Sequence, residues 1–267
     1  MDSDVEKEKM PLLDHLVELR RRLMYSSVGF LVCFFASYYF ASDIFNFLLQ
    51  PLVDIWHGDN SRRIIFTAMH EKFFTDIKVA FFAGTFIAFP IIANQIWIFI
   101  APGLYKQEKR AFLPFLVATP FLFFVGGAFV YYFVFPVAWP FFASFEQEGS
   151  NGAMAIALEP KVNEYLSLVM RLIFAFGLSF ELPVVMTLLA RARIMTSDSM
   201  RRKRRYAILL AFVAAAVLTP PDPLSQIGLA LPIIMLYEIS ILFAILIERS
   251  RAKHEALDDE TSKTEDA

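Results

Sequence analysis

Six long apolar runs, separated by clusters of charge and proline, dominate the pattern of this sequence. A membrane-spanning helix needs roughly 20 predominantly apolar residues, whereas a membrane barrel strand alternates over about ten. The runs are continuously apolar, so the pattern predicts helices and excludes a β-barrel. We expect an all-α polytopic membrane protein with six transmembrane helices in a single membrane domain, residues 1–247. The predicted spans lie near residues 24–41, 79–100, 111–135, 162–190, 207–218 and 224–247.

The last two spans differ from the other four. As a helix, residues 207–218 would reach only about 18 Å, well short of a hydrocarbon core about 30 Å thick. The run 224–247 contains Gln226, Pro232 and Glu238. A proline-rich turn at 219–223 predicts that the two form an antiparallel hairpin. We expect these helices to be short or interrupted, either thinning the bilayer or sheltering within the bundle.

Composition and charge agree with a bilayer and predict an orientation. The chain has 267 residues, of which 57% are hydrophobic and 30 are phenylalanine. Lysine and arginine mark cytoplasmic loops, and one side of the six predicted spans carries 19 of them against four on the other. Both termini are therefore predicted to be cytoplasmic. Residues 248–267 are polar and acidic toward their end, which predicts a disordered cytoplasmic tail.

Few groups within the spans offer chemistry. An ionisable side chain at a helix centre costs about 2.5–3.5 kcal/mol, so Glu181 is a candidate intramembrane polar site. Pro183 just after it favours a kink and a concave groove. The alternative is a protonated carboxyl that serves packing alone. The single cysteine, Cys33, and the spacing of the four histidines leave no metal or cofactor site, so we predict that the protein is not an enzyme.

An amphipathic cytoplasmic helix is predicted near residues 11–23, directly before the first span. Leucines recur on one face at steps of three and four, while His15, Glu18 and Arg22 share another face. One interpretation is an interfacial anchor in which Glu18 and Arg22 form an exposed ion pair. The other is a site that receives a cationic partner at the membrane surface.

The chain also resembles the TatC family, the signal-sequence receptor of the twin-arginine protein translocase. The resemblance covers roughly residues 11–247 and depends on several motifs in the same order along the chain. These motifs are His15-Leu-Val-Glu18-Leu-Arg20-Arg-Arg22-Leu23, Pro51, Trp97-Ile-Phe99-Ile-Ala-Pro102-Gly-Leu104-Tyr105-Lys106-Gln-Glu108, Phe180-Glu181-Leu-Pro183, and Leu218-Thr219-Pro220-Pro221-Asp222 with Gln226.

The resemblance implies a receptor and core subunit for folded precursor proteins that carry twin-arginine signal peptides. It implies self-association, TatA and TatB as single-span partners, export driven by the proton-motive force, and a place in the bacterial inner membrane. No nucleic acid is expected. By family analogy, signal-peptide binding falls to Glu18, Glu108, Arg20, Arg22, Phe99 and Tyr105, partner binding to Thr219 and Gln226, and structural roles to Pro51, Pro102 and Asp222. Ala216 departs from the larger residue that the family often has there.

An alternative from another class is an ion-coupled secondary transporter or channel for a small solute, with Glu181 as the coupling site. Uptake by the protein alone would favour that alternative, whereas a receptor needs its partners. An intramembrane enzyme using Ser179 beside Glu181 is a more distant third.

Overall fold

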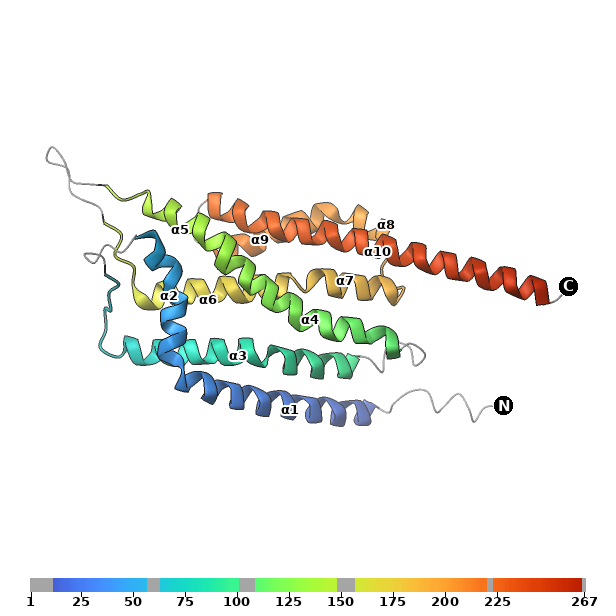
Figure 1. Ribbon diagram of the computed structural model, residues 1–267, viewed down its shortest axis with the longest axis horizontal. Helices are drawn as coiled ribbons and strands as arrows, with labels where there is room; N and C mark the ends of the chain where they lie inside the picture. The colour runs from blue at the N-terminus through green and yellow to red at the C-terminus, as the bar shows by residue number, and fades with distance from the viewer. Residues whose placement is uncertain (1–11, 57–62, 101–108, 148–156, 220–222, 266–267) are drawn as a thin grey trace. The chain divides into compact units, whose positions relative to one another are not determined.

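The computed structural model describes residues 12–56, 63–100, 109–147, 157–219 and 223–265, and these are almost entirely helical (Figure 1). No strand occurs in these ranges; Ile65 and Lys161 form an isolated parallel bridge. The predicted all-α class is therefore confirmed. The helices are α1 (Leu12–Tyr39), α2 (Ala41–Ile55), α3 (Glu71–Ile100), α4 (Lys109–Phe129), the π-helix η3 (Val130–Val134), α5 (Phe135–Ala143), α6 (Val162–Ser179), α7 (Leu182–Arg191), α8 (Ser197–Arg202), α9 (Arg204–Leu218) and α10 (Pro223–Glu265).

Four helical segments are long and apolar enough to cross a membrane. They are Glu71–Phe99, Pro114–Ala143, Val162–Arg191 and Gln226–Arg251. A fifth arises if α1 and α2, which meet at an angle of 77°, form one broken span. At 15 residues, α9 is too short by the same measure, as its apolar run predicted. The count of six spans stays a prediction.

The chain divides into two compact units. The first contains Met1–Gln50, Ile64–Pro120 and Lys161–Leu166, and the second contains Pro51–Arg63, Phe121–Pro160 and Ser167–Ala267. Pro51, predicted to be structural, is a buried residue inside α2.

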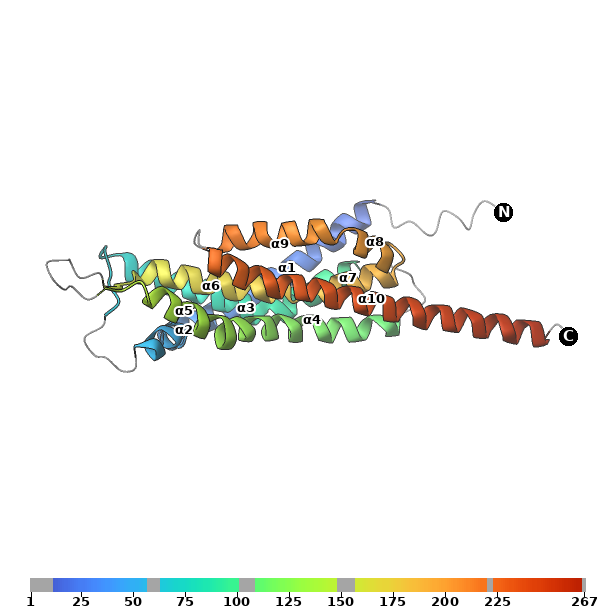
Figure 2. The ribbon, with the colours of Figure 1, turned by 90° about the horizontal axis from the view of Figure 1, so that it is seen from above.

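The first unit is built on the contact between α1 and α3, which lie side by side (Figures 1 and 2). Small residues bring the two helices together, as is common in membranes. A Cβ atom added at Gly84 would lie 2.7 Å from the Cα of Phe34, and one at Gly29 would lie 3.0 Å from Ile91. The backbones therefore approach so closely at Gly84 that only glycine fits.

The second unit contains one such close approach at a glycine, between α4 and α6, and a separate set of helix contacts around α10. A Cβ at Gly126 of α4 would lie 2.6 Å from the carbonyl oxygen of Phe176 in α6. Farther along, α10 packs against α7, α8 and α9. The hairpin of α9 and α10 is antiparallel, since Arg204 pairs with Glu238 at 2.6 Å while Gln226 reaches the backbone of Phe212.

Two expectations about the C-terminal region were wrong. First, Gln226, Pro232 and Glu238 do not interrupt α10, which is a single helix of 43 residues. Second, the segment predicted to be disordered continues α10 as far as Glu265. Alanine, glutamate, lysine and arginine, which favour helix, are frequent beyond residue 247, and neither glycine nor proline breaks the pattern there. Low hydrophobicity predicted disorder, but it does not forbid a helix that extends an existing one.

Candidate functional site

The polar face of α1 lies against the C-terminal end of α3. The ring of His15 stacks on that of Phe99, with centroids 4.3 Å apart and planes 19° from parallel. Two turns on, Arg22 donates from Nη2 to Oε1 of Glu18 at 3.1 Å and from Nη1 to Oε1 of Gln95 at 3.3 Å. Three side chains that the spacing predicted to share a face are therefore gathered at one place by α3.

This cluster is partly withdrawn from solvent. The side chains of Arg22 and Glu18 are 23% and 21% exposed, and Nε of Arg22 is buried without an acceptor in the described part of the chain. A pair at this depth interacts more strongly than one in open water, because the effective dielectric constant is lower. The pair of Glu18 and Arg22 is therefore not an exposed surface pair, since α3 covers this face of α1.

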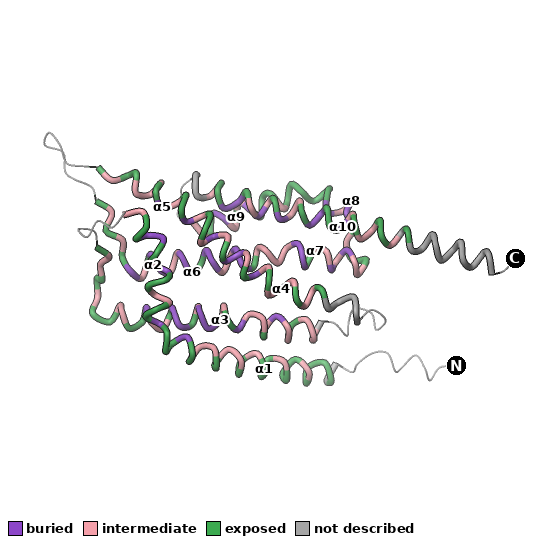
Figure 3. Tube along the Cα trace, in the orientation of Figure 1, coloured by how far each residue is buried: buried purple, intermediate pink, exposed green. Residues whose placement is uncertain are grey.

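The leucine face of α1 points the other way. Leu16 and Leu23 are 59% and 63% exposed, and α1 is drawn mainly as exposed or intermediate (Figure 3). In a membrane protein an exposed leucine stripe faces lipid or the membrane interface. Arg20 is also exposed, so it does not belong to the cluster that Glu18 and Arg22 form.

Several predicted site residues lie outside the described residues. These are Glu108, Pro102 and Tyr105, in the segment after α3, and Asp222, in the segment before α10. The structure therefore brings together Glu18, Arg22 and Phe99 among the predicted signal-peptide residues.

Gln95 is a member of this cluster that the sequence analysis missed. It follows Asn94 near the end of an otherwise apolar run, and this polar pair was the available signal. The end of α3 is also tied to α4, because Nε1 of Trp97 donates to Oγ1 of the buried Thr119 at 3.0 Å. Gln95 is thus presented to Arg22 from a helix end that is itself held in place.

Glu181 lies at the break between α6 and α7. Pro183 has no N–H, so Ser179 cannot receive the usual hydrogen bond from four residues ahead, and α6 ends at Ser179 while α7 starts at Leu182. The chain from Val162 to Arg191 still forms one segment long enough to cross a membrane. The side chain of Glu181 is half-buried. Arg171, in contrast, is exposed.

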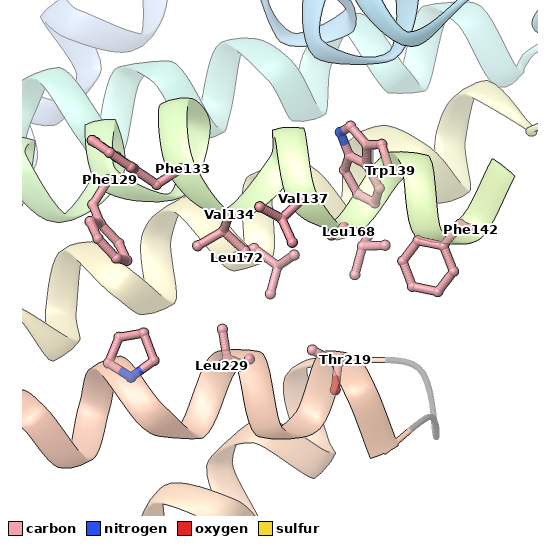
Figure 4. A pocket seen from close by; sticks show the side chains of 13 residues that line it. Phe129, Phe133, Val134, Val137, Trp139, Phe142, Leu168, Leu172, Thr219 and Leu229 are labelled. Atoms are coloured by element: carbon pink, nitrogen blue, oxygen red, sulfur yellow. The ribbon is translucent and has the colours of Figure 1, made fainter. Parts of the chain in front are cut away.

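An apolar cavity of about 240 Å³ lies within the second unit (Figure 4). Its lining residues come from the end of α4, η3, α5, α6 and α10, together with Thr219. The π-turn shapes one wall, since Phe135 donates its N–H to Val130, five residues back, and the widened turn carries Phe133 and Val134 into the lining (Figure 4). Such turns often occur at functional sites. Nothing in the sequence pattern predicted this cavity.

Thr219 and Gln226, the predicted partner-binding residues, both reach the backbone of α9. Oγ1 of Thr219 donates to the carbonyl of Ala215 at 2.8 Å, and Nε2 of Gln226 donates to that of Phe212 at 3.3 Å. Thr219 also lines the cavity. The two polar side chains are held at the same end of the α9–α10 hairpin, and Ala216 nearby is exposed.

These features define a class: an all-helical polytopic membrane protein with a polar cluster at the end of a helix pair and an apolar cavity between helices. The chain belongs to the TatC family. A family model described as Sec-independent protein translocase protein (TatC) matches residues 14–232. The protein is therefore a membrane-embedded component of a Sec-independent protein translocase and not an enzyme.

Individual relatives agree over almost the whole chain. The TatC protein of Magnetococcus marinus is 51% identical over 259 residues, which cover 97% of this chain and 92% of the relative. The TatC protein of Escherichia coli K12 is 39% identical over 263 residues, covering 97% and 99%. These relatives are protein translocase components, so small-solute transport is set aside.

A solved structure supports the same assignment. The crystal structure of a twin-arginine translocase receptor TatC superimposes with a TM-score of 0.76 at 36% identity. The match covers 88% of this chain and 99% of the other. The twin-arginine translocase component predicted from the sequence motifs is thus confirmed at the level of family and fold.

Proposed function

We propose that this protein is the receptor and core subunit of a twin-arginine translocase. It binds the signal peptides of folded precursors and assembles with the single-span proteins TatA and TatB for export driven by the proton-motive force. The protein lies in the bacterial inner membrane with both termini in the cytoplasm. The asymmetric distribution of lysine and arginine supports this orientation.

The observation that carries this proposal is the half-buried pair of Glu18 and Arg22. A carboxylate already holding a guanidinium in a fixed geometry is suited to hold another. Guanidinium is planar and always charged, and it binds carboxylate through two parallel hydrogen bonds, which lysine cannot copy. Glu108 supplies the second carboxylate in the proposal, with Phe99, Tyr105, Arg20 and Arg22 around the pair.

The two carboxylates select the signal peptide but do not supply all of its affinity. Charged hydrogen bonds contribute about 1.5–3 kcal/mol each, whereas micromolar binding requires about 8 kcal/mol. Burial of the apolar signal segment must contribute the remainder. The half-buried Glu181 and the apolar cavity lie in spanning segments that are candidates for this contact.

The test compares twin-arginine and twin-lysine peptides on purified full-length protein. We expect Glu18→Gln with Glu108→Gln to lower the affinity for the arginine peptide at least tenfold. The double variant should no longer prefer the arginine peptide to the lysine peptide. Glu159→Gln with Glu164→Gln removes two carboxylates elsewhere and should leave both affinities unchanged. If the first double variant keeps its preference for arginine, the assignment of Glu18 and Glu108 as the arginine-binding carboxylates is wrong.

Arg22 gives a second test, because it is hydrogen-bonded to the Glu18 carboxylate that would bind the arginine of the signal peptide. Replacing it as Arg22→Gln should raise the affinity for the arginine peptide by roughly tenfold, the equivalent of losing one competing charged contact. Isothermal titration on the variant and on Arg21→Gln, an exposed neighbour, measures the change. A weaker peptide affinity would instead assign Arg22 to orienting Glu18.

A further inference from the structure

A run of five cations, residues 201–205, spans the junction of α8 and α9. Arg201 and Arg202 end α8, Lys203 follows, and Arg204 and Arg205 begin α9. All five are exposed. Arg204 is neutralised by Glu238, whereas no acidic partner for Arg201, Arg202 or Lys203 occurs among the described residues. This leaves a concentrated positive patch at the point where a short helix begins.

Contacts between α8 and α10 fix the position of the patch. At the start of α8, Ser197 donates its backbone N–H to Glu248 at 2.8 Å, and Tyr237 donates its hydroxyl to the carbonyl of Met200 at 2.9 Å. The side chain of Met200 is fully buried, in a cluster with Ile241 and Ala244 of α10. One face of α8 is therefore fixed to α10, and the exposed cations are presented at a defined place.

An apolar ridge continues from the patch along α9. Leu209, Val213 and Val217 follow Arg205 at steps of four residues, so the four side chains lie in a row on one helix face. The three apolar members are 59%, 51% and 71% exposed. Beside them Tyr206 is half exposed, and the guanidinium of Arg205 lies 4.8 Å from its ring centre. Tyrosine at such a position marks the level of the lipid headgroups.

We infer that this surface of α8 and α9 binds a single anionic phospholipid. The phosphate lies on Arg201, Arg202, Lys203 and Arg205, and one acyl chain lies along the ridge of Leu209, Val213 and Val217. Arginine is suited to phosphate because its planar donors form paired hydrogen bonds with the oxygens. The charge of the patch selects an anionic lipid, since a zwitterionic headgroup brings its own cation to the same place. Basic clusters next to a membrane helix attract anionic lipid in general, and here the ridge adds a path for the chain.

The test titrates the full-length detergent-solubilised protein with phosphatidylglycerol, with phosphatidylcholine and with inorganic phosphate, and counts bound lipid by native mass spectrometry. A cation near the surface contributes roughly fivefold in affinity. Arg202→Gln with Arg205→Gln should therefore weaken phosphatidylglycerol binding by about 10- to 30-fold. The matched control, Arg249→Gln with Lys253→Gln, removes two exposed cations from α10 and should change the affinity less than twofold.

Two further arms separate the sources of the ligand chemistry. Leu209→Ser with Val213→Ser leaves the charge intact and should still weaken phosphatidylglycerol binding, whereas millimolar phosphate should not displace the lipid. Arg201→Gln with Lys203→Gln repeats the charge test if the first variant does not fold. Equal losses in the α10 control would show a general attraction to a positive surface and overturn the site. Full displacement by phosphate would reduce it to a simple anion site without a lipid.

Discussion

The α1–α3 pair and the α7–α8–α10 region are held together in different ways. Between α1 and α3, Gly84 brings two backbones into contact, and polar contacts occur at one end, around Arg22. Around α10, side chains bond directly to backbone groups. The carboxylate of Glu248 accepts from the N–H of Ser197, the hydroxyl of Tyr237 donates to the carbonyl of Met200, and the guanidinium of Arg251 donates to the carbonyl of Arg191.

The difference follows from where each backbone lies. Inside a membrane helix the backbone groups satisfy one another, so neighbouring helices gain mainly from close packing of small residues. Between α7 and α9 the chain leaves the helix, with Arg193 at a positive φ of 58°, and backbone groups need other partners. Polar side chains of α10 supply them. Apolar segments thus select glycine, while connecting segments select side chains that donate or accept.

The largest expected effect comes from filling the glycine contacts. Gly84→Ala and Gly126→Ala each place a methyl group within 2.7 Å of backbone atoms, which cannot rotate away. We expect each to lower the free energy of unfolding by about 3 kcal/mol, the upper part of the range for overpacking. Gly228→Ala is the matched control, since nothing lies within 4 Å of its Cβ position. Equal stability of Gly84→Ala and Gly228→Ala in lipid would contradict the close approach.

A smaller effect is expected where the polar contacts dominate. Glu248→Ala removes the acceptor for the backbone N–H of Ser197, a residue that is 7% exposed. The loss should be about 2 kcal/mol, since the bonds are charge-assisted and a buried donor is left unsatisfied. Hydrogen–deuterium exchange should become faster in α8 and stay unchanged in α1 and α3. The exposed Arg249→Ala serves as control, and faster exchange throughout the chain would argue against a local contact.

The smallest effect tests one of the polar bonds within the first unit. Trp97→Phe removes the hydrogen bond to Thr119 and should cost about 1 kcal/mol. A double-mutant cycle with Thr119→Val should recover a coupling of similar size, because each single change removes the same bond. If the two losses in the free energy of unfolding simply add, Trp97 stabilises the unit through packing alone. The hydrogen bond between Trp97 and Thr119 would then contribute nothing measurable.

The helices were largely predictable, but their ends were not. The apolar runs marked α3, α6 and α9, because burial in lipid requires a continuous apolar segment. However, α3 begins at Glu71, eight residues before the predicted start. Its carboxylate accepts N–H groups of Thr67 and Asn163, and Asn163 comes from a distant part of the chain. The bond from Thr67 is local, but the bond from Asn163 depends on a distant partner and leaves no local pattern.

One part of the candidate site was predictable from the sequence, and the other part was not. Periodicity placed His15, Glu18 and Arg22 on one face of a helix, and the ordered motifs indicated the family. The contacts that α3 makes with the neighbours of Glu18, from Gln95 to Arg22 and from Phe99 to His15, join residues more than 70 positions apart. The cavity beside the π-turn has no signature either, because five separate elements contribute to its wall.

The sequence by itself determined the solvent, the helical class and the family, because these depend on how many apolar residues occur in a row and which motifs follow in order. Tertiary structure alone decided that α3 covers the polar face of α1, that Gln95 binds Arg22, and that α8 is held on α10. Hydrophobic periodicity specifies which residues share a face but not what that face meets. The partner is decided by packing, where a glycine allows approach and a distant side chain satisfies a polar group.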